Sequence, residues 1–238
     1  MTDATRTAID ELIAQRYSER ARFDPNRPIS EEDLDAILKA ARWAPTAHNM
    51  QNFEIVVVDD PRVLAEIANV HGSGVSEEFI RENYEQLSFS EDEFRAKGTG
   101  LLATMFPPSW RDPEQALHEP VGPARSSLGE TTRSCPVVLI VLYDPRKRAP
   151  ASEGDFLGII SLGCVMQNMW LTAASRSIGM QIMSVFSGAE VEPKLRSILS
   201  IPQHLKIAYA CRLGYAEQPR EYLRVRRELS RFVHRNTY

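Results

Sequence analysis

The sequence has few cysteines, few histidines and no excess of positive charge, and each shortage excludes a class of protein. No pair among Cys135, Cys164 and Cys211 has the spacing of a zinc site or a redox motif, so we expect reduced thiols. The five histidines are scattered, which argues against a histidine-based metal site. The net charge of -4 gives no reason to expect nucleic acid or an anionic membrane as a partner.

Several signatures of catalysis and targeting are also missing. The chain has no G-x-x-x-x-G-K-[ST] loop, no G-x-S-x-G turn and no H-E-x-x-H motif. Residues 98–103, GTGLLA, fit a dinucleotide pattern but follow a charged stretch rather than an apolar strand, so we discard the match. The N-terminal residues 1–15 include acids and no apolar core, which does not predict a secretory signal. We expect a cytoplasmic protein.

Helix and strand patterns are mixed along the chain rather than strictly alternating, which favours an α+β fold. Apolar residues at helical spacing predict a helix before Arg16 and another from Ser30, a candidate N-cap, to Pro45. Residues 155–178 are apolar but interrupted by polar side chains, which predicts a buried helix rather than a membrane span. Continuous apolar runs predict buried strands at residues 53–58, 137–143, 181–186 and 206–213.

Residues 71–131 differ in composition from the rest of the chain, because they are rich in Glu, Ser, Gly and Pro with scattered aromatic residues. We interpret them as an insertion of short helices and loops within a single domain spanning residues 1–238. A long excursion of this kind is often an active-site lid, and a surface elaboration without a role is the alternative. Its aromatic residues would either fence a flat substrate or only pack the insertion: Phe79, Tyr84, Phe106 and Trp110.

The most informative stretch is residues 16–58. It opens with Arg16, Ser18 and Arg20, continues with the capped helix and ends in a polar loop, residues 45–49, before a buried strand. A helix end flanked by Arg and Ser side chains can hold a phosphate. A polar loop can present amides and hydroxyls to the edge of a flat heterocycle. Together these features suggest a site for flavin mononucleotide (FMN).

At these residues the chain resembles the nitroreductase family of FMN flavoproteins. That family carries an Arg-x-Ser-x-[Arg/Lys] element, followed by a helix that ends in A-x-x-A-P-[S/T]-x-x-N-x-Q. The matching residues here are Arg16, Ser18, Arg20, Ala41, Ala44, Pro45, Thr46, Asn49 and Gln51. The family usually has Pro after this Gln, where this chain has Asn52. The resemblance is strong over the first sixty residues, moderate from residue 136 onward and slight over residues 71–131.

The resemblance implies two FMN-binding segments in the first fifty residues. Arg16, Tyr17, Ser18 and Arg20 would contact the phosphate and ribityl chain. A cation at Arg20 would also lie near N1 and the C2 carbonyl of the flavin, where it stabilises the anionic reduced ring. Three residues would contact FMN from the opposite subunit of a dimer: Pro45, Thr46 and Asn49.

Two further segments are implied by the same resemblance. The stretch GMQIMSVF would bring Ile182, Met183 and Ser184 past the N5 edge of the ring, although each is individually compatible with an ordinary strand. Near the C-terminus Arg224 and Arg226 would return to the phosphate, since the planar guanidinium binds two oxygens at once. A solvated cluster of charges is the alternative for this arginine-rich tail.

The resemblance further implies an intertwined homodimer with a mixed sheet surrounded by helices, and no metal. FMN would pass hydride from NADPH or NADH to a nitroaromatic, quinone or similar small acceptor, so no side-chain nucleophile is required. Two alternatives remain: an FMN-dependent dehalogenase or oxidase of the same fold, and a non-catalytic flavin-binding protein.

Overall fold

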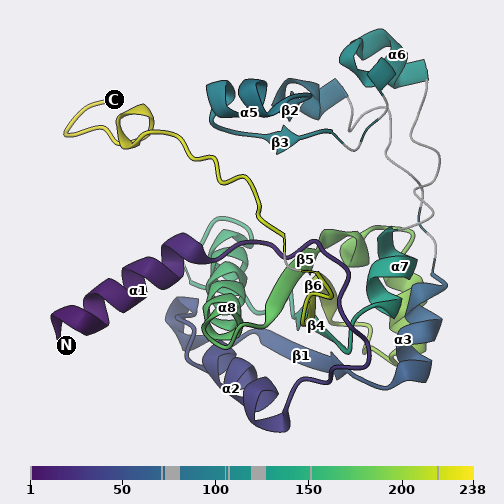
Figure 1. The fold of residues 1–238 in the computed structure, drawn as a ribbon. Coiled ribbons are helices and arrows are strands. Elements are labelled where there is room, and N and C mark those ends of the chain that lie inside the picture. The colour runs from purple at the N-terminus through teal and green to yellow at the C-terminus, as the bar shows by residue number, and fades with distance from the viewer. Residues whose placement is uncertain are drawn as a thin grey trace. The chain divides into compact units, whose positions relative to one another are not determined.

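The computed structural model describes residues 2–70, 72, 81–104, 106, 108–118, 127–150, 152–218 and 220–238. The chain divides into two compact units (Figure 1). The first comprises Met1–Gly72 and Ser126–Arg220, and the second comprises Ser73–Arg125 and Glu221–Tyr238. The second unit therefore combines most of the predicted insertion with the C-terminal tail. That residues 1–238 act as one domain with a lid stays a prediction.

The first unit is built on a four-stranded sheet with the order β1-β4-β6-β5. Its neighbouring strands pair antiparallel, with Val56 opposite Ile140 and Ile182 opposite Cys211, and a register shift falls between Val141 and Leu142. The strands are β1 (Phe53–Val58), β4 (Val137–Tyr143), β5 (Gly179–Met183) and β6 (Lys206–Gly214). Together with the helices below, the sheet confirms the predicted α+β class.

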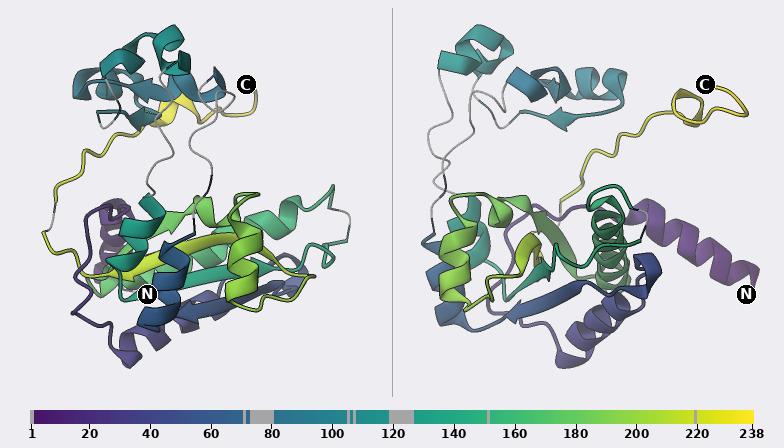
Figure 2. Two further views of the ribbon diagram at one scale, coloured as in Figure 1. Left: turned by 90° about the vertical axis from the view of Figure 1, so that its right-hand side faces the viewer. Right: turned by 180° about the vertical axis from the view of Figure 1, so that it is seen from behind.

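Helices cover both faces of this sheet (Figure 2). Helices α2 (Glu31–Arg42) and α8 (Phe156–Ser175) pack on one face. Helices α3 (Pro61–Ala68) and α9 (Glu192–Ile198) pack on the other, where α7 (Ser127–Arg133) lies against α3. Alternate residues of β4 enter the two cores, which explains why its sequence is an unbroken apolar run.

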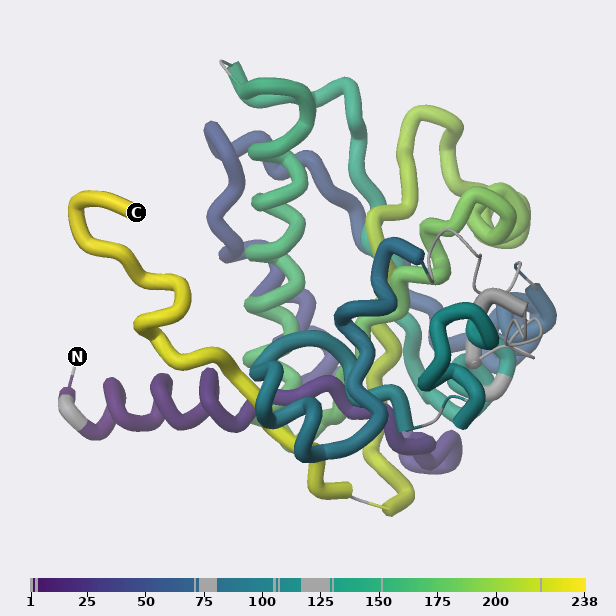
Figure 3. Tube along the Cα trace, turned by 90° about the horizontal axis from the view of Figure 1, so that it is seen from above, coloured from purple at the N-terminus to yellow at the C-terminus, as the bar shows by residue number. Residues whose placement is uncertain are grey.

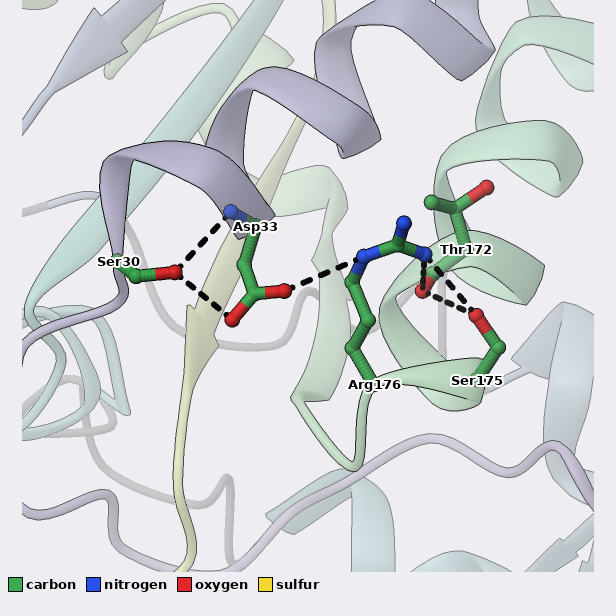
Figure 4. Close-up of polar contacts among 5 residues, drawn as sticks. All are labelled: Ser30, Asp33, Thr172, Ser175 and Arg176. Carbon is green, nitrogen blue, oxygen red and sulfur yellow. Dashed lines mark hydrogen bonds and ion pairs between the residues drawn. The ribbon is translucent and has the colours of Figure 1, made fainter.

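Helices α2 and α8 run antiparallel and are joined at one end by a polar cluster (Figure 4). Ser30 caps α2, because its hydroxyl accepts from the Asp33 N–H at 3.1 Å and donates to the Asp33 carboxylate at 2.9 Å. Arg176, just after α8, places Nε 3.2 Å from the other Asp33 oxygen. The predicted N-cap, Ser30, is confirmed. The Asp33 carboxylate accepts a hydrogen bond from the Ser30 hydroxyl and pairs with the Arg176 guanidinium.

Helix α8 is, within the described part of the chain, the helix that has the length and hydropathy of a membrane span. Its inward side chains pack in the core with the sheet, including Val165 and Met169. Polar side chains along it bond to the α2 region, since Asn168 Nδ2 donates to the Ala40 carbonyl at 3.1 Å. These contacts fit the predicted core helix.

Helix α1 (Asp3–Gln15) precedes the first unit's sheet and is capped by Thr2, whose hydroxyl accepts from the Thr5 N–H. The predicted apolar stripe lies on this helix. Within one chain it is largely open to solvent, because Ile9 is 42 % and Ile13 is 49 % exposed. Part of the apolar surface of α1 is therefore left uncovered within one chain.

The second unit is made of short elements. It contains η2 (Tyr84–Gln86), β2 (Leu87–Ser88), α5 (Glu91–Lys97), β3 (Leu101–Leu102), η3 (Pro108–Arg111), α6 (Pro113–His118) and η5 (Leu229–Arg231). Strands β2 and β3 pair in parallel. Between α5 and β3, Gly100 has φ 94°, and a Cβ there would lie 2.1 Å from the Gln86 carbonyl oxygen. Only glycine allows this approach.

Aromatic residues fill the small core of the second unit. Trp110 is 1 % exposed and stacks on Phe106, with ring centroids 4.6 Å apart. The Tyr84 hydroxyl donates to the Trp110 and Arg111 carbonyls. These contacts favour the packing alternative for Trp110, whose ring is buried, whereas Phe106 is half-buried and its part in fencing a substrate stays a prediction. Phe79 lies outside the described residues.

Candidate functional site

The Arg16–Arg20 segment is fixed along the edge of the sheet. The Glu19 N–H donates to the Met180 carbonyl in β5 at 3.0 Å, and the Trp170 indole of α8 donates to the Tyr17 carbonyl at 3.1 Å. Gly179 permits this close approach, because a Cβ there would lie 2.8 Å from Glu19 Cγ. The backbone of the segment is therefore held by a carbonyl of a strand and by a side chain of a helix.

A buried cation lies beneath the same segment. Arg212 in β6 is fully buried, and its Nη2 donates to the carbonyls of Glu19 (3.1 Å) and Ala21 (2.8 Å). Its Nε donates to Gln181 Oε1 at 2.6 Å, and its guanidinium lies 4.2 Å from the centre of the Phe23 ring. Sequence reasoning missed this residue. The available signal was a lone arginine within an apolar strand.

The predicted side chains of this segment lie at different depths. Ser18 is half-buried and Arg20 is exposed. The Arg16 guanidinium lies 4.2 Å from the centre of the Trp170 ring, in a cation–π arrangement that orients it against α8. The Tyr17 hydroxyl donates to Glu19 Oε2 at 3.3 Å. The segment thus presents a hydroxyl and a cation beside β5.

The end of β5 supplies the second predicted segment. Met183 is buried in the core between the sheet and α3, so only its backbone is open to a ligand. Ile182 is half-buried, and the exposed Ser184 begins the short helix η4 (Ser184–Ser187). The first N–H groups of a helical turn have no intrahelical partners, and no side chain caps this one. The first N–H groups of η4, at Ser184, are therefore candidate donors to a ligand.

These two segments lie along one strand. Glu19 is bonded opposite Met180, and Ser184 is four residues farther along the chain. At the rise of a strand this separation is about 13 Å. The structure therefore brings the Arg16–Arg20 segment and the Ile182–Ser184 segment to one edge of the first unit.

The third predicted segment is a loop with unusual backbone geometry. His48, Asn49 and Gln51 have φ values of 50°, 53° and 44°, in the left-handed region that side-chain-bearing residues rarely adopt. The loop is held by Thr46, whose hydroxyl accepts from the Gln51 N–H at 3.2 Å. Asn49 Oδ1 accepts a hydrogen bond from the side-chain amide of Gln51, Nε2, at 2.9 Å. Strain of this kind concentrates at functional sites.

Within one chain this loop does not meet the Arg16–Arg20 segment. The Ala47 N–H donates to the Ser161 hydroxyl at 3.0 Å, near the start of α8, whereas Tyr17 is bonded to Trp170 near its end. Nine residues of helix separate these anchors by about 14 Å. In Figure 3 the chain after α1 crosses the C-terminal end of α8, and the loop lies toward the other end.

The fourth predicted segment belongs to the second unit. Arg224 and Arg226 are exposed in the tail, and Arg226 Nη1 donates to the Val225 carbonyl at 2.7 Å. That they meet the other predicted residues, which belong to the first unit, stays a prediction.

No metal centre is found among the residues that the structure describes, and the thiols of Cys135 and Cys211 are buried. No three metal-type ligands converge there. Burial raises the pKa of the Cys135 thiol to about 12 and also raises the pKa of Cys211. Both thiols thus remain protonated near neutral pH and are poor nucleophiles.

Comparison with known proteins places this arrangement in a family. The family model described as "Nitroreductase family" matches residues 13–215. A nitrobenzene nitroreductase of Ectopseudomonas oleovorans is 25 % identical, over 95 % of this chain and 97 % of that protein. The crystal structure of a nitroreductase with bound FMN from Bacteroides fragilis superposes with a TM-score of 0.59 at 19 % identity, covering 94 % of this chain and 96 % of the other.

A second solved structure has the same fold. The FMN-dependent nitroreductase of Clostridium difficile R20291 gives a TM-score of 0.61 at 18 % identity, covering 95 % of this chain and 98 % of that one. At these identities the structures establish the fold alone. The family match extends over the Arg16–Arg20 segment, the strained loop and the end of β5 together. With the fold and the family match in agreement, this chain belongs to the nitroreductase family.

Proposed function

We propose that this protein transfers hydride from NADPH or NADH, through FMN, to a nitroaromatic, quinone or similar small acceptor. The observation that carries the proposal is the backbone pairing of Glu19 with Met180. It aligns a segment bearing Ser18 and Arg20 with a strand that ends in η4, whose first N–H groups have no side-chain cap. As a member of the nitroreductase family, this chain is an FMN-dependent oxidoreductase. The identity of its reductant and of its acceptor is our proposal.

The donors present fit FMN. A phosphate requires cations and N–H or O–H donors, which Arg16, Ser18 and Arg20 provide at one end of the edge. The isoalloxazine ring requires an apolar flank and backbone donors, which Ile182 and the first turn of η4 provide at the other. When bound, FMN supplies a ring position, N5, that accepts and donates hydride.

The chain's own residues then hold and tune this ring. The exposed Arg20 would stabilise negative charge at the N1 and C2 edge, and the Ser184 N–H would donate toward N5. Arg212 has a separate, supporting role. By donating to the Glu19 and Ala21 carbonyls, it fixes the backbone on both sides of Arg20. No protein nucleophile is needed.

A homodimer would complete the site. Ser161 lies five residues from the first residue of α8, and Trp170 lies five residues from its last. A two-fold axis at the middle of α8 would therefore place the Thr46–Asn49 loop of one subunit beside the partner's Arg16–Arg20 segment. Apolar residues on the start of α8 support such packing, because Phe156 is 66 %, Ile159 57 % and Ile160 46 % exposed.

The dimer is tested by placing a charge on this face. Ile160→Asp should give monomers in sedimentation and lose FMN together with dimerisation, since burying an unpaired carboxylate is unfavourable. Leu101→Asp is the matched control, because Leu101 is 41 % exposed but lies in the second unit. A monomeric Ile160→Asp protein that keeps its full FMN content would contradict a shared site.

The phosphate contact is tested by Arg16→Ala. We expect FMN binding to weaken by about 1.5–3 kcal/mol, the contribution of a charged hydrogen bond. Titration of the apoprotein with FMN measures the change. Arg22→Ala is the control, because Arg22 forms an exposed ion pair with Glu217 at 3.2 Å. Unchanged FMN affinity in Arg16→Ala would remove this residue from the site.

The activity itself is tested in two half-reactions. The visible spectrum of the purified protein should show a non-covalent flavin that NADH or NADPH bleaches without oxygen. Nitroaromatics, quinones and halogenated phenols are then offered to the reduced protein. Turnover with nitroaromatics or quinones supports the proposal, and turnover restricted to halogenated phenols favours a dehalogenase. A flavin that NAD(P)H does not reduce would indicate a binding protein instead.

A further inference from the structure

A buried side-chain amide without a hydrogen-bond partner lies beside the start of α8. It belongs to Asn52, which directly follows the strained loop (residues 46–51) and is 1 % exposed. Among the described residues, neither its Nδ2 nor its Oδ1 has a hydrogen-bond partner. Buried polar atoms of side chains are nearly always hydrogen-bonded, because an unpaired one has lost its bonds to water without replacement. The amide of Asn52 therefore needs a partner.

A second unpaired atom lies next to this amide. Asp155, the residue before α8, has a buried Oδ1 that also lacks a partner within the described part of the chain. A Cβ at Gly158 would lie 2.6 Å from this Oδ1 and 3.2 Å from Asn52 Nδ2. Both atoms therefore border the same small space, which exists because Gly158 has no side chain. Neither atom is accessible to water.

The carboxylate of Asp155 does not have the usual task of an aspartate that precedes a helix. Such an aspartate normally accepts from N–H groups of the first turn, and its own backbone is extended. Asp155 makes no capping bond, and its φ of −109° and ψ of 16° are not extended. A carboxylate only accepts hydrogen bonds, and Nδ2 is the donor end of the Asn52 amide. The two unpaired atoms are thus complementary.

A bond between them would attach the strained loop to α8 at a second point. The first point is the hydrogen bond from the Ala47 N–H to the Ser161 hydroxyl, at 3.0 Å. Asn52 lies at the other end of the loop, where its carbonyl accepts from the Asp144 N–H at 3.3 Å. The loop contains three side-chain-bearing residues with left-handed backbone, and such backbone persists only where its surroundings hold it. An attachment at each end supplies that constraint.

We propose that Asn52 is a positioning residue, whose amide donates to the Asp155 carboxylate and so holds the strained loop in the conformation that binds FMN. It acts through Thr46 and Asn49, which the proposed function places beside the cofactor. The inference rests on that function, because it takes FMN as the ligand of the loop. Proline has no side-chain amide, so family members with the usual Pro after the Gln cannot form this bond.

Reversing the two groups tests the pair directly. Asn52→Asp places two carboxylates against each other and should weaken FMN binding by at least about tenfold. Adding Asp155→Asn exchanges donor and acceptor and should restore most of the affinity, because the bond can form again. Titration of each apoprotein with FMN measures both changes. Asn26→Asp is the matched control, since Asn26 is exposed in the first unit, and it should leave the affinity unchanged.

Hydrogen exchange of the apoprotein reports on the loop without any cofactor. In Asn52→Ala, the Ala47 and Gln51 amides should exchange about tenfold faster, while the amides of β4 keep their protection. Gly158→Ala should act in the same direction although alanine favours a helix, because its Cβ would collide with the Asp155 carboxylate. In an Asn52→Ala background it should add little, since the carboxylate is then free to move.

The pair and the proposed function fail in different ways. Unchanged exchange at Ala47 and Gln51 in Asn52→Ala would overturn the inference, and so would a reversed pair that binds FMN no better than Asn52→Asp alone. A loosened loop with undiminished FMN affinity would overturn it as well, because the loop would then not bind the cofactor. If Asn52→Asp does not fold, recovery of folding on adding Asp155→Asn supports the pair, and no recovery contradicts it. A protein that binds no flavin, yet shows the expected exchange, would refute the proposed function and confirm the bond.

Discussion

The two units of this protein differ in how their cores are built. In the first, a four-stranded sheet is buried on both faces between helices. In the second, strands of two residues and short helices surround a small core, whose buried members among the described residues are Leu87, Ala103, Trp110 and Ala116. Because burial of apolar surface dominates stability, the second unit should open at a lower free energy than the first. We therefore expect the first unit to be the more rigid of the two and the second to adapt its conformation more readily.

The largest expected effect removes the buried cation of the first unit. Arg212→Ala should destabilise the protein by about 3–5 kcal/mol, because the Glu19 and Ala21 carbonyls and the Gln181 amide lose their donor. Urea unfolding measures the change. Lys39→Ala is the control, since it breaks only an exposed pair with Asp35 and should change stability by less than about 1 kcal/mol. Similar midpoints for the two variants would refute the structural role of Arg212.

The next effect should be confined to the second unit. Trp110→Ala removes the largest buried side chain of that unit and should cost it about 3 kcal/mol. Hydrogen exchange should then accelerate at β2, α5 and β3 while the amides of β4 and β6 keep their protection. Accelerated exchange in β4 and β6 as well would show that the units unfold as one, and the comparison would fail.

The third effect is a loss of stability of the first unit at alkaline pH, which is small for each step in pH. Burial raises the pKa of Cys135 from 9.0 to about 12, so above pH 9 the unfolded chain loses a proton that the folded chain retains. Stability should be full below pH 9 and fall between pH 9 and 12, by up to about 1.4 kcal/mol per pH unit. Burial also raises the pKa values of Cys211 and Tyr209, which act in the same direction. Urea unfolding of Cys135→Ala should show a shallower slope, and identical slopes would contradict this assignment.

Local features were predictable from the sequence, and non-local ones were not. The Ser30 cap and strands β1, β4 and β6 follow from side chains close in sequence, and the structure has them. The predicted strand at residues 181–186 was misplaced. It runs instead from Gly179 to Met183, because the chain turns into η4 at Ser184. No apolar periodicity marks such a turn.

The candidate site shows the same division. Its residue types were recognisable from the Arg-x-Ser-x-Arg element, but the partners of Arg212 are brought from nearly two hundred residues away by the sheet. The left-handed backbone at Gln51 was equally hidden, since glutamine does not favour it. The association of the tail with α5 joins segments that are more than one hundred residues apart, and no pattern within either segment reveals it.

Gly100 has a consequence for how this chain can vary. Any side chain there would collide with the Gln86 carbonyl, and the positive φ adds strain for every other residue type. A population of sequences that keeps the β2–β3 pair must therefore be invariant at position 100. The neighbouring Leu101 is exposed and free to change. Two neighbouring positions of the second unit should thus differ sharply in how many residue types they accept. Position 100 should accept only glycine, whereas position 101 should accept many side chains.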